Sequence, residues 1–160
     1  MNFKVFIRNI FIVMVATFML SACATKSATL PGQMQGDGYS GTDTVEYLAK
    51  GVPDRVFFAT NESVLTTASS DTLRKQATWM RSNDSLSFAI EGHADERGTR
   101  EYNLALGERR ANVAKDYLMT YGISGNRLSV ISYGKERPVN SGSNPLAWSQ
   151  NRRSVTVKAN

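Results

Sequence analysis

The chain has very few of the residues from which most catalytic and metal-binding sites are built. Its 160 residues include a single histidine and a single cysteine, which excludes an intrachain disulfide and a zinc site with several histidine ligands. The patterns H-E-x-x-H and G-x-S-x-G and glycine-rich phosphate loops are absent. We therefore expect no cofactor, no metal and no catalysis, and a structural hydrogen-bonding role for the lone His93.

The sequence also lacks an apolar run long enough to cross a membrane comfortably. Its main apolar run covers residues 10–20 and follows Lys4 and Arg8. Basic residues before a short apolar run are typical of a secretory signal peptide, whereas a membrane-spanning helix needs about 20 apolar residues. We interpret residues 1–22 as a signal peptide.

This segment ends at the only cysteine. Leu20-Ser21-Ala22-Cys23 resembles the bacterial lipoprotein processing signal, in which the thiol accepts a diacylglyceryl group. The alternative is a chance cysteine after an ordinary signal peptide. We expect Cys23 to begin the mature chain and to carry lipid that anchors it to a membrane. Ala24 in place of Asp favours the outer membrane, by the sorting pattern known for this class.

A strong excess of charge is missing as well. The whole chain carries a net charge of +5, and without Lys4 and Arg8 the 17 basic and 14 acidic residues leave +3. Nucleic-acid binding usually requires a clustered basic face, so we expect no nucleic-acid partner. Residues 23–52 are rich in Ser, Thr, Gly and Gln and are predicted to be a flexible tether, followed by one domain over residues 53–160.

Within this domain the hydrophobic pattern predicts strands that alternate with helices. The spacing of Leu73, Ala77 and Met80 predicts a helix that ends before residue 82. Residues 140–145 are a strong breaker of regular structure. The expected strands lie at residues 56–58, 86–92, 128–133 and 155–158.

A second helix is predicted between Thr99, a suitable N-cap, and Gly122, a typical residue just beyond a helix end. At about 100° per residue, Asn103 and Arg110 project into the middle of its core-facing stripe, whereas Arg109 falls outside it. The apolar members of that stripe are Leu106, Val113, Ala114, Tyr117, Leu118 and Tyr121.

A guanidinium on a core-facing stripe is costly unless it is paired. Asp95 lies in the loop between the strand at 86–92 and this helix, so it can approach Arg110. One interpretation is that the two residues simply neutralise each other. The other is a pocket for a ligand that carries both charges, in which Arg110 binds a carboxylate and Asp95 binds an ammonium.

For the other arginines near this region the sequence supports less specific predictions. Arg97 and Arg100 are expected to face solvent, with contact to a ligand or partner as the alternative. Arg152 and Arg153 precede a strand, where alternation sends their side chains to opposite faces. One of them is expected to flank the site and the other to lie on the surface.

Three blocks of sequence resemble the OmpA-like peptidoglycan-binding domain, most closely its branch of peptidoglycan-associated lipoproteins. They are Gly92–Ala111 (GHADERGTREYNLALGERRA), Ser132–Pro138 (SYGKERP) and Asn151-Arg152-Arg153, within a resemblance that covers about residues 54–158. The resemblance implies an α/β fold of the α+β sandwich kind, a βαβαβ-type domain in which a mixed sheet packs against helices.

The resemblance also implies a ligand and the residues that hold it. The family binds the meso-diaminopimelate of the peptidoglycan stem peptide, whose side chain ends in one ammonium and one carboxylate. The family's Asp, Arg and Asn fall on Asp95, Arg110 and Asn103. Further candidate ligand-binding positions are Phe58, Ala59, Asn61, Gly98, Thr99 and Leu106.

One departure from the family pattern concerns the end of the first strand. The usual pattern is F-D-x-D or F-D-x-N, whereas this chain has Phe58-Ala59-Thr60-Asn61. The first carboxylate is therefore missing, and backbone groups together with Asn61 remain to make the contact.

The resemblance implies a lipoprotein, facing the periplasm, that tethers the outer membrane to peptidoglycan. It also implies contact with TolB, a periplasmic propeller protein, and with other Tol proteins, in a system that serves envelope integrity and cell division. The alternative is an interaction lipoprotein whose main ligand is another envelope protein and whose wall binding has been lost with the change at Ala59.

Overall fold

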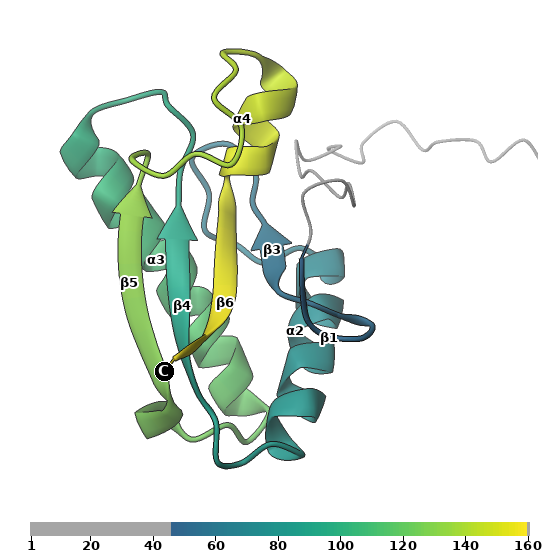
Figure 1. Ribbon diagram of the computed structural model, residues 1–160. Helices are drawn as coiled ribbons and strands as arrows, with labels where there is room; N and C mark the ends of the chain where they lie inside the picture. Colours follow the sequence, from purple (N-terminus) through teal and green to yellow (C-terminus); the bar gives the residue numbers. More distant parts are fainter. Residues whose placement is uncertain (1–45, 160) are drawn as a thin grey trace, which may run out of the picture. The chain divides into compact units, whose positions relative to one another are not determined.

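The computed structural model describes residues 46–159 of the chain. The predicted signal peptide, Cys23 and most of the predicted tether lie outside the described residues. The described part is a two-layer α/β domain in which two long helices, α2 and α3, pack on one face of a four-stranded sheet (Figure 1). The expected mixed sheet packed against helices is confirmed.

The sheet has the strand order β3-β6-β4-β5. Its strands are β3 (Arg55–Phe57), β4 (Ser87–His93), β5 (Leu128–Gly134) and β6 (Arg153–Ala159). β4 pairs with β5 in parallel and with β6 antiparallel, while β3 pairs antiparallel with β6. β6, the last strand in sequence, therefore lies between β3 and β4. The order of the strands along the chain does not suggest this placement.

The two long helices begin and end where capping residues allow them to. α2 (Thr67–Arg81) is capped by Thr66, whose side chain accepts from the Ser69 amide. α3 (Arg100–Thr120) is capped by Thr99, whose side chain accepts from the Tyr102 amide. Gly122, with φ of 85°, follows the end of α3 in the left-handed region that glycine adopts most readily. The predicted caps of α3 are confirmed.

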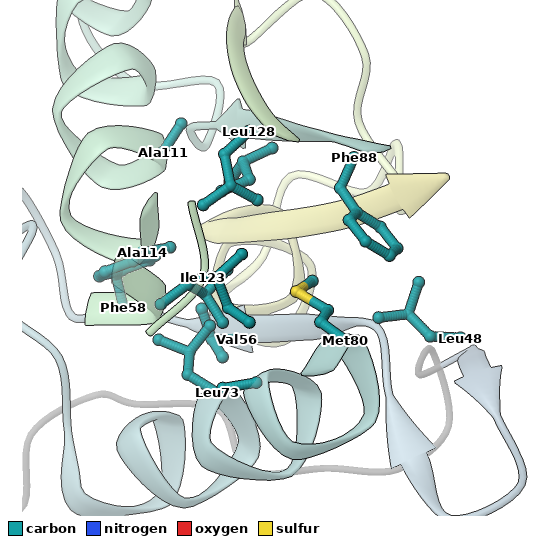
Figure 2. Packing of buried hydrophobic residues seen from close by; sticks show 13 residues of the cluster. Leu48, Val56, Phe58, Leu73, Met80, Phe88, Ala111, Ala114, Ile123 and Leu128 are labelled. Carbon is teal, nitrogen blue, oxygen red and sulfur yellow. The ribbon is translucent and has the colours of Figure 1, made fainter. Parts of the chain in front are cut away.

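The hydrophobic core lies between the helices and the sheet (Figure 2). α2 contributes the predicted residues Leu73, Ala77 and Met80, which are almost fully buried. On α3 the predicted stripe is buried at Leu106, Ala114 and Leu118, but Tyr121 at the helix end is 36% exposed. Tyr121 stacks on Tyr117 instead, at a distance of 5.1 Å between the ring centres.

Two further elements appear that the hydrophobic pattern did not predict. A short hairpin of β1 (Tyr47–Ala49) and β2 (Val52–Pro53) precedes the sheet, and its Leu48 joins the core. Regular structure therefore begins before residue 53, although the polar composition there favoured a tether. The second element is α4 (Pro145–Asn151), a short helix that begins at the end of the predicted breaker and has Asn144 as its N-cap. A short 3-10 turn (Gly125–Arg127) leads into β5.

β4 and α3 approach each other very closely at Gly92 and Gly107. A Cβ atom at Gly92 would collide with the carbonyl oxygen of Gly107, and a Cβ atom at Gly107 would collide with the Ser132 hydroxyl. Ser132 in turn donates to the carbonyl of Leu104 at 2.6 Å. Glycine at both positions thus sets the distance between the helix and the sheet, and with it the position of Arg110, one turn further along α3.

Within residues 46–159, no helix has the length and apolar character that a membrane crossing requires.

Candidate functional site

Asp95 lies two residues after the end of β4, and its carboxylate is almost fully buried. Arg97, two residues later, donates to it from Nε (3.2 Å to Oδ1), from Nη2 (2.7 Å to Oδ2) and from its main-chain amide (3.1 Å to Oδ1). Arg152, next to β6, approaches from the other side, with Nη1 3.4 Å from Oδ2. Asp95 is therefore held between two arginines.

These contacts decide the charge of the carboxylate. Burial alone raises the pKa of Asp95, but the hydrogen bonds and positive charges of Arg97 and Arg152 outweigh burial and lower the pKa below its usual value. Asp95 is consequently ionised at neutral pH and can attract a ligand cation.

Arg110 lies on the core side of α3 with no exposed surface, while the adjacent Arg109 is exposed. Its guanidinium donates to three main-chain carbonyls, those of Glu62 (2.8 Å), His93 (2.8 Å) and Ala59 (3.0 Å). The guanidinium also lies 5.2 Å from the ring centre of Phe58. The contrast between positions 109 and 110 that helical periodicity predicted is confirmed.

Burial, and next the positive charge of Arg152, lower the pKa of Arg110 to about 10. Arg110 therefore stays protonated at neutral pH. The Asp95 carboxylate acts in the opposite direction and favours the charged form of Arg110, so the two groups influence each other electrostatically.

The direct Asp95–Arg110 pair, one of the two interpretations from the sequence, is wrong for this structure. Asp95 is neutralised by Arg97 and Arg152, and Arg110 is satisfied by carbonyl oxygens. Arg152 lies 57 residues from Asp95 in sequence, and the insertion of β6 beside β4 brings it to the carboxylate.

The loop between β4 and α3 is fixed by the other predicted residues of that segment. Asn103 is buried and donates from Nδ2 to the carbonyl of Arg97 at 2.8 Å. Gly98 has φ of 93°, and its carbonyl accepts from Lys135 Nζ at 2.7 Å. Thr99 caps α3. These residues hold the main chain around Asp95 in place.

The predicted positions after β3 lie on the other side of Arg110. Phe58 is fully buried beneath the Arg110 guanidinium, and the carbonyl of Ala59 accepts a hydrogen bond from that guanidinium. Asn61 is exposed and adopts φ of 58°, a turn conformation that asparagine tolerates. Leu106 is buried one turn before Arg110. The predicted residues 58–61 and 95–110 therefore converge at one end of the sheet.

Three features at this end of the domain were not predicted. Arg97 is exposed, as expected, but it also binds Asp95 and lies over the ring of Trp148, 4.4 Å from its centre. Trp148 belongs to α4, which was not predicted. Arg152 is the arginine that flanks the site, but Arg153 is buried and not on the surface. The Asn151-Arg152-Arg153 motif was the only sequence signal for this side.

His93 is buried at the end of β4, against the ring of Tyr133. The expected hydrogen-bonding role of its side chain is wrong, because neither ring nitrogen has a hydrogen-bond partner. Its main-chain carbonyl accepts from Arg110. The Glu91 carboxylate lies 3.7 Å from Nε2. The described residues include no cluster of three or more His, Cys, Asp or Glu side chains suited to a metal ion.

We expect His93 to make the domain less stable as the pH falls. Burial, followed by the charges of Arg153, Arg137 and Arg55, lowers the pKa of His93 from 6.5 to about 3. Between these pH values the unfolded chain binds a proton that the folded chain does not. The free energy of unfolding should therefore fall by roughly 1.4 kcal/mol for each pH unit below about 6.5.

Urea denaturation between pH 7 and 4.5 measures this slope. His93→Phe keeps a flat ring beside Tyr133 but cannot titrate. The free energy of unfolding of the variant should therefore depend less steeply on pH, by the contribution of about one proton. Acidic groups such as Asp95 are common to both chains. Equal slopes of the free energy of unfolding against pH would therefore contradict the role of His93.

Comparisons with known proteins identify the family of the chain. The sequence pattern of the OmpA family matches residues 57–152. The chain is 45% identical over 152 residues to a peptidoglycan-associated lipoprotein of Rhizobium meliloti, covering 92% of this chain and 86% of that protein. It is 44% identical over 150 residues to the one of Brucella melitensis, covering 89% of each.

The chain belongs to the OmpA family, in its branch of peptidoglycan-associated lipoproteins. Among solved structures, the peptidoglycan-associated lipoprotein from Burkholderia pseudomallei matches with a TM-score of 0.65 at 34% identity, covering 66% of this chain and 90% of that one. The C-terminal domain of Helicobacter pylori MotB matches with a TM-score of 0.62 at 18% identity, covering 67% of this chain and 84% of that one. The second likeness concerns the fold alone.

Proposed function

We propose that this OmpA-family domain is a non-catalytic module that binds peptidoglycan non-covalently through the diaminopimelate of the stem peptide. The side chain of that residue ends in one ammonium and one carboxylate. A carboxylate suits the planar fork of Arg110, and an ammonium suits the ionised Asp95. The names of the relatives and the convergence of residues 58–61 with residues 95–110 support this proposal.

The observation that carries the proposal is the state of Arg110. Its guanidinium has no exposed surface, yet the three acceptors found within residues 46–159 are neutral carbonyls. A buried cation without a carboxylate partner is costly. Arginine has five N–H groups, and three are used, so two remain to receive the carboxylate of a ligand. The cost is then offset when the ligand binds.

A ligand can reach Arg110 only if the segment that encloses it moves. Ala59 and Glu62 supply two of the three carbonyl acceptors, and Asn61 between them has positive φ. The third acceptor, His93, belongs to the central strand β4 and stays fixed. We infer that residues 59–62 shift outward on binding, and that main-chain groups there contact the ligand in place of the carboxylate that Ala59 lacks.

The proposed role in the cell combines this site with the amino-terminal segment. Lipid on Cys23 would hold the chain in the outer membrane, facing the periplasm, while the domain grips the wall. The protein would thereby tether the membrane to peptidoglycan as part of the Tol-Pal system, with TolB and other Tol proteins as partners. The branch of the family to which the chain belongs supports this role.

A second function is kept because of one specific difference. Ala59 stands where the family has a carboxylate, and its loss favours an interaction lipoprotein that binds another envelope protein in preference to the wall. Incubation of the purified chain with isolated sacculi decides between the two. Under the proposed function the protein should sediment with sacculi and be released by a soluble peptide that contains diaminopimelate. Absence of co-sedimentation would favour the second function.

We predict that Cys23→Ser abolishes membrane attachment. Each buried methylene contributes about 0.8 kcal/mol, so several acyl chains on one cysteine hold a chain firmly without a spanning helix. Mass spectrometry of the native amino terminus should find a lipid-modified Cys23 as the first residue, and fractionation should find the Ser variant outside the outer membrane. An unmodified Cys23, or a mature chain that starts elsewhere, would contradict the prediction. Ala24→Ser is the matched control and should leave attachment unchanged.

A further inference from the structure

We propose that Arg97 is a displaceable internal cation that occupies the Asp95 carboxylate when no ligand is bound and gives way to the ligand's ammonium. Arg97 would thus weaken ligand binding by competition, which lets the site release the wall more readily. This inference rests on the proposed function, because it concerns the same carboxylate.

The Arg97 guanidinium occupies the two Asp95 oxygens to which a ligand ammonium would bind. Nε of Arg97 is 3.2 Å from Oδ1 and Nη2 is 2.7 Å from Oδ2, so the guanidinium covers both oxygens. An ammonium that approaches Asp95 must therefore compete for the same two acceptors. The pair is local, two residues apart, so it forms whenever the loop is folded.

Burial identifies which of the two arginines can leave. The Arg97 side chain is 42% exposed, whereas that of Arg152 is 4% exposed. Arg152 is also anchored, because its Nε donates to the carbonyl of Phe58 at 3.0 Å and its own carbonyl accepts from the Phe58 amide at 2.9 Å. A cation arriving from solvent therefore displaces Arg97 and leaves Arg152 in place.

Trp148 gives the displaced guanidinium a place to remain. The Arg97 guanidinium lies 4.4 Å from the centre of the Trp148 ring, a cation–π contact that does not require Asp95. The indole N–H donates to Glu96 Oε1 at 2.8 Å, and Ser143 donates to Oε2 of the same carboxylate at 2.9 Å. The ring is thus oriented by Glu96 and does not depend on the Arg97–Asp95 contact.

The main chain around Arg97 is held independently of its side chain. Its carbonyl accepts from Asn103 Nδ2 at 2.8 Å, and Lys135 Nζ donates to the carbonyls of Glu96 (3.2 Å) and Gly98 (2.7 Å). Nη2 of Arg97 also donates to the Thr60 hydroxyl at 3.4 Å, so displacement of the guanidinium breaks this side-chain contact but none of these main-chain contacts.

Titration calorimetry of the full-length chain with the tripeptide L-Ala-γ-D-Glu-meso-diaminopimelate tests the proposal. Arg97→Gln removes the competing charge and should tighten binding by about threefold to fivefold, the scale of a partly exposed ion pair. Arg100→Gln is the matched control, because Arg100 is more exposed, pairs with Glu136 and does not contact Asp95. It should leave the affinity unchanged. Equal or weaker binding by Arg97→Gln would overturn the proposal, since Arg97 would then be inert or a ligand contact.

A second measurement separates this inference from the proposed function. NMR titration of the Asp95 carboxyl without ligand should find a higher pKa in Arg97→Gln than in the wild-type chain, because the main local cation has been removed. An unchanged pKa of Asp95 would overturn the role of Arg97 whatever the chain binds. A wild-type chain that binds no tripeptide would instead refute the proposed function, even with the Arg97 contact intact.

Discussion

Replacing Arg110 with leucine is expected to weaken binding of a diaminopimelate-containing peptide by about thirtyfold to several thousandfold. Loss of one partner from a buried charge pair costs roughly 2–5 kcal/mol, which corresponds to that range of affinity. Arg110 is enclosed and is the nearest guanidinium to the carbonyls of residues 59 and 62. Arg110→Lys should restore little affinity, because an ammonium cannot bind a carboxylate in the bidentate geometry of a guanidinium.

Arg109→Leu is the matched control. Arg109 precedes Arg110 on the same helix but is exposed, so its replacement should change affinity only slightly. Thermal melts must accompany each titration, since Arg110→Leu also leaves three carbonyl acceptors without their donor. The site is wrong if the two leucine variants lose affinity equally, or if a folded Arg110→Leu chain binds normally.

Replacing Gly92 with alanine is expected to destabilise the domain more than almost any other change of one methyl group. The new Cβ atom would overlap the carbonyl oxygen of Gly107, and both groups belong to rigid main chain in β4 and α3. Overpacking of this kind costs about 3 kcal/mol. For a domain of this size that cost lowers the melting temperature by roughly 12–20 °C.

Gly125→Ala provides the comparison. A Cβ atom at Gly125 would lie 3.3 Å from Cε of Met119, the end of a flexible side chain that can move aside. Calorimetric melts of both variants should therefore find a large loss for Gly92→Ala and a small change for Gly125→Ala. Similar melting temperatures for the two variants would contradict the close helix–sheet contact. Gly92→Ala should also weaken ligand binding, because α3 carries Arg110.

Features that depend on neighbours in sequence were predictable. The N-cap at Thr99, the glycine after α3 and the different environments of Arg109 and Arg110 follow from helical geometry, which repeats every 3.6 residues. The structure confirms all three. The short helix α4 had comparable signals in Asn144 and Pro145, but the loop residues before them obscured its start.

Features that depend on strand order were not predictable. The hydrophobic pattern locates β6 without indicating its neighbours, and the chain could have added it at an edge of the sheet. Its insertion between β3 and β4 brings Arg152 to Asp95 and to Phe58. The same insertion encloses His93 and Arg153, whose pKa values burial lowers.

The sequence by itself determined the family, the two long helices and the four strands of the main sheet, because each is encoded in a short contiguous pattern. Only the tertiary structure decided which charges pair. An ion pair depends on distance in space, and Asp95 had several arginines within reach along the chain. The packing of β6 and α4 against the β4–α3 loop selects Arg97 and Arg152 for Asp95, and leaves Arg110 with three main-chain carbonyls as its acceptors.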